Sequence, residues 1–231
     1  MNNLICLILA GGFGTRLRSV VADVPKPLAP VAGKPFLYWL LKNLEQQGGK
    51  EVILSLHHQA ETIQEFLQSV VFELEIQTVV ETDPLGTGGA IAFAIQQMDV
   101  QRPFVVMNGD TWLSQSLSEL QLHLPPAIGL VYVEDISRYG GVDWQDDLVK
   151  SFQEKHPKAS PGWINAGAYH LSPEDFNNWD GQPTSLERDL LPKWVQQGRL
   201  RACPLETDFI DIGIPEDYQY FCQWQTSKIQ K

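Results

Sequence analysis

The sequence predicts an α/β protein with a doubly wound (Rossmann-like), mostly parallel mixed sheet in a single domain over residues 1–231. In the first half, short apolar runs alternate with longer amphipathic stretches, an order typical of parallel strands covered by helices. The chain shows no internal repeat, no low-complexity tract and no obvious linker. Its 43% hydrophobic and 19% charged content is that of an ordinary globular protein.

The first half contains four apolar runs and three amphipathic stretches between them. The predicted strands are 4–10, 51–56, 74–81 and 103–110. The predicted helices are 35–48, 60–70 and 86–98. Pro35 suits the first turn of a helix and Gly48 suits its end, so both bounds of the first helix have a physical reason.

The pattern changes from about residue 127, where apolar runs are joined by turns rich in Gly, Asp and Pro. The predicted strands of this mixed second half are 128–133, 148–152, 163–171 and 200–206. The predicted helices are 185–198 and 215–225. The tail 227–231 is expected to be too polar to add structure.

The charge balance narrows the possible ligands. The formal net charge is −11 and no Lys/Arg cluster stands out, so we expect neither nucleic acid nor a membrane surface as a partner. No apolar stretch approaches the roughly 20 residues that span a bilayer, and no basic leader precedes the first strand. Cys6, Cys203 and Cys222 lack paired metal spacing, which favours thiols in a reducing cytoplasm.

The most informative motif is LAGGFGTRL (9–17), which follows the first predicted strand. Three closely spaced glycines let a backbone turn tightly and approach a ligand, and Arg16 adds a forked positive charge. No Lys-Ser or Lys-Thr pair follows, and Leu17 stands where a dinucleotide fingerprint needs its third glycine. The motif therefore predicts a backbone nest for a phosphate chain and argues against a nicotinamide-dependent oxidoreductase.

Further charged residues are expected near the glycine turn in the folded chain. Lys26 is flanked by prolines that fix its backbone, and Asp110 follows the fourth predicted strand. Ligands of doubly wound sheets sit beyond the carboxyl ends of strands, so the glycine turn, Glu81 and Asp110 should share one rim. Asp110 and Asp211 together are the kind of carboxylate pair that binds Mg²⁺ beside phosphate oxygens.

The motifs LAGGFGTRL, PKPL, DPLGTGGA, NGD, EK, INAG and FIDIGIPEDY occur in this order along the chain. This series resembles the sugar-1-phosphate nucleotidyltransferases and covers essentially the whole sequence. The stretch VADVPKPLAPVAGKPFL is most similar to the bacterial branch that acts on D-glycero-D-manno-heptose 1-phosphate. The resemblance implies a nucleotide-binding half (1–125), a sugar-phosphate-binding half (126–225) and no C-terminal β-helix domain.

The resemblance also implies the reaction. A sugar 1-phosphate attacks the α-phosphorus of a nucleoside triphosphate, pyrophosphate leaves, and Mg²⁺ is the cofactor. The implied catalytic residues are Arg16, Lys26 and Asp110, with Asp110 and Asp211 as metal ligands. The implied nucleotide-binding residues are Leu9, Ala10, Gly11, Gly12, Gly14, Thr15, Glu81, Gly86, Thr87 and Gly88. The implied sugar-phosphate-binding residues are Glu154, Lys155, Asn165, Gly167 and Glu187.

The base is inferred from Glu81. Guanine presents two neighbouring donors, N1–H and the 2-amino group, and one carboxylate can accept from both. We therefore expect GTP and a heptose 1-phosphate as substrates, and a possible homo-oligomer.

Other substrate pairs remain open, namely mannose 1-phosphate with GTP or N-acetylmuramate 1-phosphate with UTP. A catalytically silent subunit that binds nucleotide sugars also remains open. His57 and His58 lack metal-ligand partners and are expected in turn or surface roles.

Overall fold

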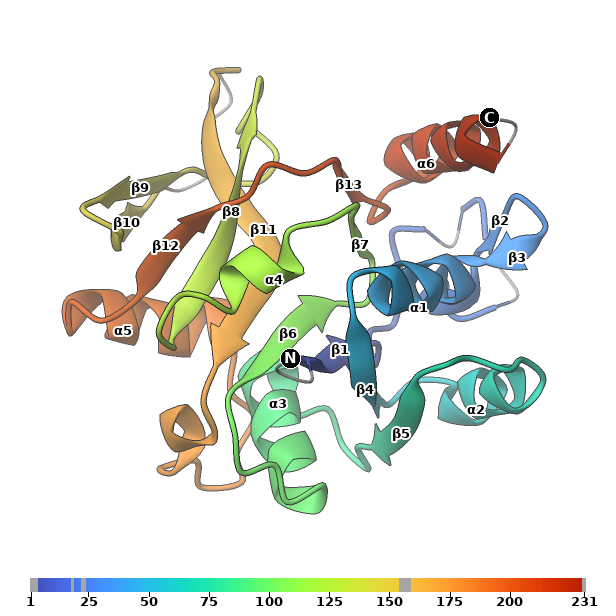
Figure 1. Cartoon of the computed structure of the whole chain (residues 1–231), viewed down its shortest axis with the longest axis horizontal. Coiled ribbons are helices and arrows are strands. Elements are labelled where there is room, and N and C mark those ends of the chain that lie inside the picture. The colour runs from blue at the N-terminus through green and yellow to red at the C-terminus, as the bar shows by residue number, and fades with distance from the viewer. Residues whose placement is uncertain (1–3, 18, 22–23, 154–158, 230–231) are drawn as a thin grey trace.

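The computed structural model describes residues 4–17, 19–21, 24–153 and 159–229. A nine-stranded sheet runs through the molecule in the order β5-β4-β1-β6-β11-β8-β12-β10-β9 (Figure 1). Its strands are β1 (Leu4–Leu9), β4 (Gly49–Leu56), β5 (Glu75–Val80), β6 (Phe104–Asn108), β8 (Ala127–Val133), β9 (Val142–Gln145), β10 (Leu148–Phe152), β11 (Gly162–Leu171) and β12 (Arg201–Pro204). The predicted doubly wound, mixed α/β architecture is confirmed.

The first half of the sheet is parallel and the second half is mixed, as predicted. Strands β5, β4, β1 and β6 pair in parallel, whereas β11 is antiparallel to both β6 and β8. The chain moves from β1 outward to β4 and β5, then returns to the other side of β1 with β6. The order of strands therefore reverses between β1 and β6, which makes their carboxyl ends the expected ligand position.

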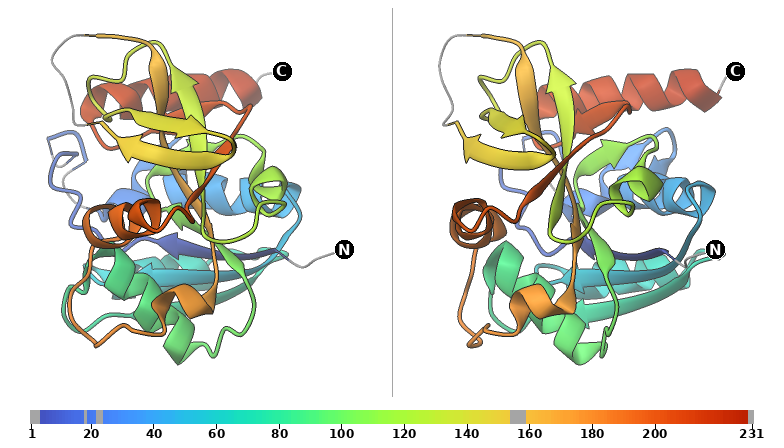
Figure 2. Two further views of the ribbon diagram at one scale, coloured as in Figure 1. Left: turned by 90° about the vertical axis from the view of Figure 1, so that its left-hand side faces the viewer. Right: turned by 60° about the vertical axis from the view of Figure 1, so that its left-hand side comes forward.

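Helices cover both faces of the sheet (Figure 2). The longer ones are α1 (Phe36–Gln46), α2 (Ala60–Gln68), α3 (Gly86–Gln97) and α6 (Pro215–Ile229), and the shorter ones are α4 (Leu117–Leu120) and α5 (Leu191–Gln196). Helices α1 and α6 pack in one core with Cys6 and Ile8 of β1, while α3 and α5 pack in a second core with Ile5 and Leu7. Side chains of a strand alternate between faces, so β1 is buried on both.

Short elements complete the rim of the sheet. They are β2 (Pro30–Val31), β3 (Lys34–Pro35), β7 (Thr111–Leu113), β13 (Phe209–Asp211), the 3₁₀ turns η1 (Lys26–Leu28) and η2 (Pro173–Phe176), and the π-helical turn η3 (Leu186–Leu190). The antiparallel pair β7–β13 joins the end of β6 to the chain before α6. This pairing brings residues about 100 positions apart onto one edge.

The structure corrects two expectations. Helix α6 continues to Ile229, so the prediction that residues 227–229 add no structure was wrong. Ser227 and Lys228 are exposed but helical, because only the inner face of a surface helix needs to be apolar. The predicted helix 185–198 consists of η3 followed by α5, with Pro192 at the start of α5. No helix in the described part of the chain is long and apolar enough to cross a membrane.

Candidate active site

The glycine turn and Asp110 meet where β1 and β6 end. Leu9 is paired with Asn108 in the parallel ladder, and the backbone N–H of Gly109 donates to the Leu9 carbonyl at 2.9 Å. A Cβ atom on Gly109 would lie 2.6 Å from that oxygen, so only glycine allows this approach. The predicted common rim of the turn and Asp110 is confirmed.

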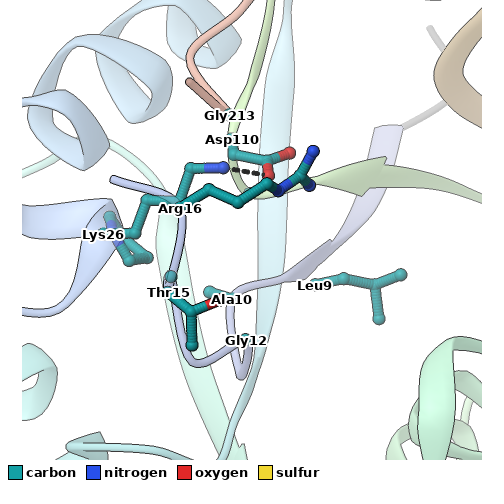
Figure 3. A pocket seen from close by; sticks show the side chains of 11 residues that line it. Leu9, Ala10, Gly12, Thr15, Arg16, Lys26, Asp110 and Gly213 are labelled. Atoms are coloured by element: carbon teal, nitrogen blue, oxygen red, sulfur yellow. Dashed lines mark hydrogen bonds and ion pairs between the residues drawn. The ribbon is translucent and has the colours of Figure 1, made fainter. Parts of the chain in front are cut away.

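A cavity of about 200 Å³ opens over the glycine turn (Figure 3). Its lining contains eight of the residues expected from the sequence, together with Pro27, Gly109 and Gly213. The eight are Leu9, Ala10, Gly12, Gly14, Thr15, Arg16, Lys26 and Asp110. Gly14 has φ +60°, and a Cβ there would lie 3.0 Å from the Cβ of Lys26, so the turn packs closely against the lysine.

Two cations line this cavity, and one of them is paired with Asp110. The Lys26 ammonium donates to Oδ2 of Asp110, and the side chain of Lys26 is only 10% exposed. The Arg16 side chain lines the same cavity (Figure 3), and its positive charge favours the ionised form of neighbouring Asp211. The cavity thus holds two positive charges, one of them already paired with a carboxylate.

Asp211 lies beside Asp110 because of the β7–β13 ladder. Asp211 is paired with Thr111, and the N–H of Ile212 donates to the Asp110 carbonyl at 2.9 Å. The Gly213 N–H donates to Oδ1 of Asp211 at 2.7 Å. Burial and the neighbouring charge of Asp110 both raise the pKa of Asp211 above its usual range.

This carboxylate pair fits the binding of Mg²⁺. Burial, and then the nearby charge of Asp110, disfavour the ionised form of Asp211, and a bound divalent cation would offset both effects. Mg²⁺ is held in proteins by one or two carboxylates, with substrate phosphates and water completing its octahedron. Asp110 and Asp211 are thus oxygen donors of the kind that Mg²⁺ takes, and of the two only Asp110 lines the cavities.

A second cavity, of about 330 Å³, adjoins the first, since Leu9, Gly12 and Asp110 line both. It extends from the glycine turn toward the ends of β4 and β5 and the first turn of α3. Its lining comprises Leu9, Gly11, Gly12, Phe13, Ser55, His57, Glu81, Pro84, Gly86, Thr87, Ala90, Asn108, Asp110 and Glu187. The two cavities are therefore contiguous at the rim of the sheet.

Glu81 is buried in the wall of this second cavity, with 7% of its surface exposed. Its Oε1 accepts from the Ser55 hydroxyl at 3.0 Å, and its Oε2 accepts from the backbone N–H of Leu85 at 3.0 Å. No cation in the described part of the chain forms an ion pair with it. The carboxylate is therefore held by neutral donors, next to the N-terminus of α3, which favours a negative charge.

Glu187 is positioned by residues of the α3 loop. Its Oε2 accepts from the Thr87 hydroxyl at 2.7 Å and from the Ser185 hydroxyl at 3.2 Å. The Thr87 oxygen in turn accepts from the Leu186 N–H at 2.8 Å. Gly86 has φ +71°, and a Cβ there would lie 2.7 Å from the Thr184 carbonyl oxygen. The predicted nucleotide loop and the predicted sugar-binding glutamate are thus locked together.

Several predicted residues, Asp211 among them, line neither cavity. The Asn165 amide donates to the Tyr169 hydroxyl at 2.7 Å and accepts from the Gly167 N–H at 2.9 Å. Gly167 has φ +66°, and a Cβ there would lie 2.7 Å from Nδ2 of Asn108. The lack of a side chain at Gly167 therefore leaves room for Asn108. Gly88 packs under the loop, where its N–H donates to the Thr184 carbonyl. Glu154 and Lys155 lie outside the described residues.

The sequence interpretation missed Ser55, His57, Phe13 and Asn108 as cavity residues. The expected turn or surface role of His57 was incomplete, because its ring lines the second cavity and its Nδ1 lies 3.0 Å from the Glu81 carbonyl oxygen. Ser55 and His57 stand at the carboxyl end of β4. The rule that ligands gather at strand ends, applied to this strand, would have identified both.

Comparisons with known proteins agree with this geometry. The chain is 40% identical to a D-glycero-alpha-D-manno-heptose 1-phosphate guanylyltransferase from Campylobacter jejuni, over 93% of this chain and 97% of that protein. It is 36% identical to an enzyme of the same name from Aneurinibacillus thermoaerophilus, over 92% and 94%. The crystal structure of HddC from Yersinia pseudotuberculosis superposes with a TM-score of 0.85 at 39% identity, covering 95% of this chain and 98% of that one.

More distant similarity extends to other substrates. A mannose-1-phosphate guanylyltransferase catalytic subunit beta from Drosophila melanogaster is 34% identical over 100% of this chain and 65% of that protein. Residues 5–225 match the nucleotidyl transferase family. With the phosphate nest, the carboxylate pair and the sheet topology in agreement, the chain belongs to the nucleotidyl transferase family.

Proposed function

We propose that this protein transfers the guanylyl group of GTP to D-glycero-D-manno-heptose 1-phosphate, giving a GDP-heptose and pyrophosphate. One observation carries the proposal: of two adjoining cavities, the first is lined by the glycine turn and its cations and the second by the buried carboxylate of Glu81. The first suits a triphosphate and the second suits a base with neighbouring donors. A crystal structure of HddC from Yersinia pseudotuberculosis complexed with GMP-PN supports the choice of a guanine nucleotide.

The reaction needs no protein nucleophile. An oxygen of the sugar phosphate attacks the α-phosphorus of GTP in line, the new P–O bond forms, and the bond to the β-phosphate oxygen breaks with that oxygen keeping the electron pair. The residues then contribute position and charge. Arg16 stabilises the departing pyrophosphate, and the backbone N–H groups of the glycine turn hold the triphosphate in place.

Lys26 can pair with either of two anions, the Asp110 carboxylate or a substrate phosphate. In the structure its ammonium pairs with Asp110. When the triphosphate binds, Lys26 exchanges this carboxylate for the phosphate under attack, which gains negative charge density in the transition state. Asp110 and Asp211 would hold Mg²⁺, and the bound ion supplies charge neutralisation for the phosphates.

The sugar is assigned from the relatives and from Glu187. The two heptose-phosphate enzymes match nearly the full length of this chain. Glu187 lines the cavity beside the nucleotide loop, which supports a role in accepting hydrogen bonds from sugar hydroxyls. Mannose 1-phosphate is the second candidate, because mannose-1-phosphate guanylyltransferases are 34–37% identical to this chain. A nucleoside triphosphate substrate and three free cysteines fit a cytoplasmic enzyme.

The test is pyrophosphate release with purified protein. GTP, UTP, dTTP, CTP and ATP are each combined with the 1-phosphates of D-glycero-D-manno-heptose, mannose and N-acetylmuramate, with and without Mg²⁺. Metal-dependent release that is fastest with GTP and the heptose phosphate is the expected result. Fastest release with the mannose phosphate would replace the sugar, and no release from folded protein would favour a nucleotide-sugar-binding subunit.

A further inference from the structure

The Glu81 carboxylate is held unusually firmly for a side chain inside an open cavity. Ser55 donates to Oε1 and the Leu85 N–H donates to Oε2, both at 3.0 Å. The backbone N–H and C=O groups of Glu81 are also both hydrogen-bonded. Its N–H donates to the Leu56 carbonyl at 2.9 Å, and its carbonyl accepts from Nδ1 of His57, because a carbonyl oxygen can only accept.

The remaining hydrogen-bonding capacity of this carboxylate can be counted. An ionised carboxylate has about four acceptor sites, two on each oxygen. The Ser55 hydroxyl occupies one site on Oε1, and the Leu85 N–H occupies one site on Oε2. Each oxygen therefore keeps about one open site, and both belong to a side chain that is 7% exposed at the cavity wall.

Two open sites match guanine better than the other bases. The Watson–Crick edge of guanine offers N1–H and the 2-amino group side by side. Uracil and thymine offer one donor, which leaves one buried acceptor site unfilled, and adenine and cytosine turn a ring nitrogen acceptor toward the carboxylate. An acceptor site of a buried carboxylate that stays unfilled, or that faces another acceptor, costs binding free energy. The arrangement therefore selects guanine over the other bases as well as binding it.

We propose that Ser55 is a positioning residue for guanine selection. Its hydroxyl fixes the rotation of the Glu81 carboxylate and leaves one open acceptor site on each oxygen. Without it, Oε1 has two open sites and only the Leu85 N–H still restrains the carboxylate, so the match to two neighbouring donors is weakened. Ser55 is 1% exposed and acts through Glu81. The inference rests on the proposed use of GTP.

The experiment compares GTP with ITP, whose base lacks the 2-amino group and is otherwise identical. We expect the wild-type protein to prefer GTP by roughly tenfold or more in kcat/KM, the effect of one charge-assisted hydrogen bond. In Ser55→Ala the preference falls toward one, mainly because KM for GTP rises while kcat with saturating GTP changes little. A general loss of structure would lower the rate with both nucleotides equally.

Two further variants keep the outcome clear. Ser151→Ala is the matched control, because the Ser151 hydroxyl also donates to a carboxylate, Oδ2 of Asp143 at 2.8 Å, on exposed strands away from the cavity. It should keep the wild-type preference for GTP. If Ser55→Ala does not fold, Ser55→Cys retains the volume with a weaker donor, and its preference for GTP must also fall.

An unchanged GTP-to-ITP ratio in a folded Ser55 variant would overturn the inference and leave guanylyl transfer intact. Equal use of GTP and ITP by the wild-type protein would overturn it in the same way. Turnover of UTP but not GTP by the wild-type protein would instead reject the proposed function, and the inference with it.

Discussion

The two ends of the site hold their carboxylates in opposite ways. At the phosphate end, Asp110 is paired with the Lys26 ammonium, and its own charge helps raise the pKa of neighbouring Asp211. At the base end, Glu81 is held by a hydroxyl and a backbone N–H. Charged partners can be exchanged for substrate phosphates and metal, whereas neutral donors at fixed positions do not need to move. One end is suited to neutralising charge during reaction and the other to selecting a ligand.

The largest effect should come from removing the exchangeable cation. In Lys26→Ala, kcat should fall by about 10²–10³-fold, because the phosphate under attack loses a positive charge that matters most in the transition state. Steady-state kinetics of pyrophosphate release measures this. Lys34→Ala, which removes a lysine stacked on the Tyr38 ring, is the control and should retain full activity. A loss confined to KM would show that Lys26 only binds substrate.

Asp211→Asn should raise the Mg²⁺ concentration needed for half-maximal activity by roughly tenfold or more, since one of the two carboxylates proposed to hold the metal is lost. A metal titration at saturating GTP measures it. The amide keeps an oxygen for the Gly213 N–H, so folding should be preserved. Asp208→Asn, which changes a carboxylate bonded to Ser114, is the control. An unchanged metal requirement would remove Asp211 from the metal site.

Glu81→Gln tests the other end of the site. An amide presents one acceptor and one donor group, the pattern that complements uracil or thymine, so kcat/KM for GTP should fall by roughly ten- to a hundredfold while that for UTP rises. Separate kinetics with each nucleotide give the ratio. Glu75→Gln, at an exposed position of β5, should leave it unchanged. An unaltered preference in Glu81→Gln would show that the base is read elsewhere.

The smallest effect concerns stability away from the site. Burial lowers the pKa of His170 below its ordinary 6.5, although its Nδ1–H donates to the His123 carbonyl at 2.7 Å. The unfolded chain therefore binds this proton more readily, so the free energy of unfolding decreases as the pH falls from about 6.5 through the folded-state pKa. His170→Asn retains a donor without titrating and should show a shallower decrease between pH 7 and 5 in urea unfolding. Equal slopes would contradict this assignment.

The phosphate end could be predicted more fully from the sequence than the base end. Gly12, Gly14, Arg16 and Lys26 lie close together in the chain, so a local motif reports their proximity, and Asp110 follows from the rule on strand ends. The bonds that hold Glu81 come from the ends of two neighbouring parallel strands and from a loop, and hydrogen bonds of this kind leave no spacing pattern. The β7–β13 ladder that aligns Asp211 was equally hidden, because its strands are three residues each.

The same limit explains the tail and the sugar side. The end of α6 is polar on its exposed face, and composition alone cannot distinguish such a turn from an unstructured tail. Thr87 was assigned to the nucleotide from its loop, but its hydroxyl donates to Glu187, a partner 100 residues away. Contacts over such separations depend on tertiary packing and become visible only in the folded chain.

The most direct test of the central claim is a competition for base. Protein, Mg²⁺ and D-glycero-D-manno-heptose 1-phosphate are incubated with GTP, UTP, dTTP, CTP and ATP at equal concentrations, and the nucleotide sugars are resolved by mass spectrometry. A buried carboxylate with two open acceptor sites predicts that GDP-heptose predominates. A predominance of UDP- or dTDP-heptose would contradict guanine selection by Glu81.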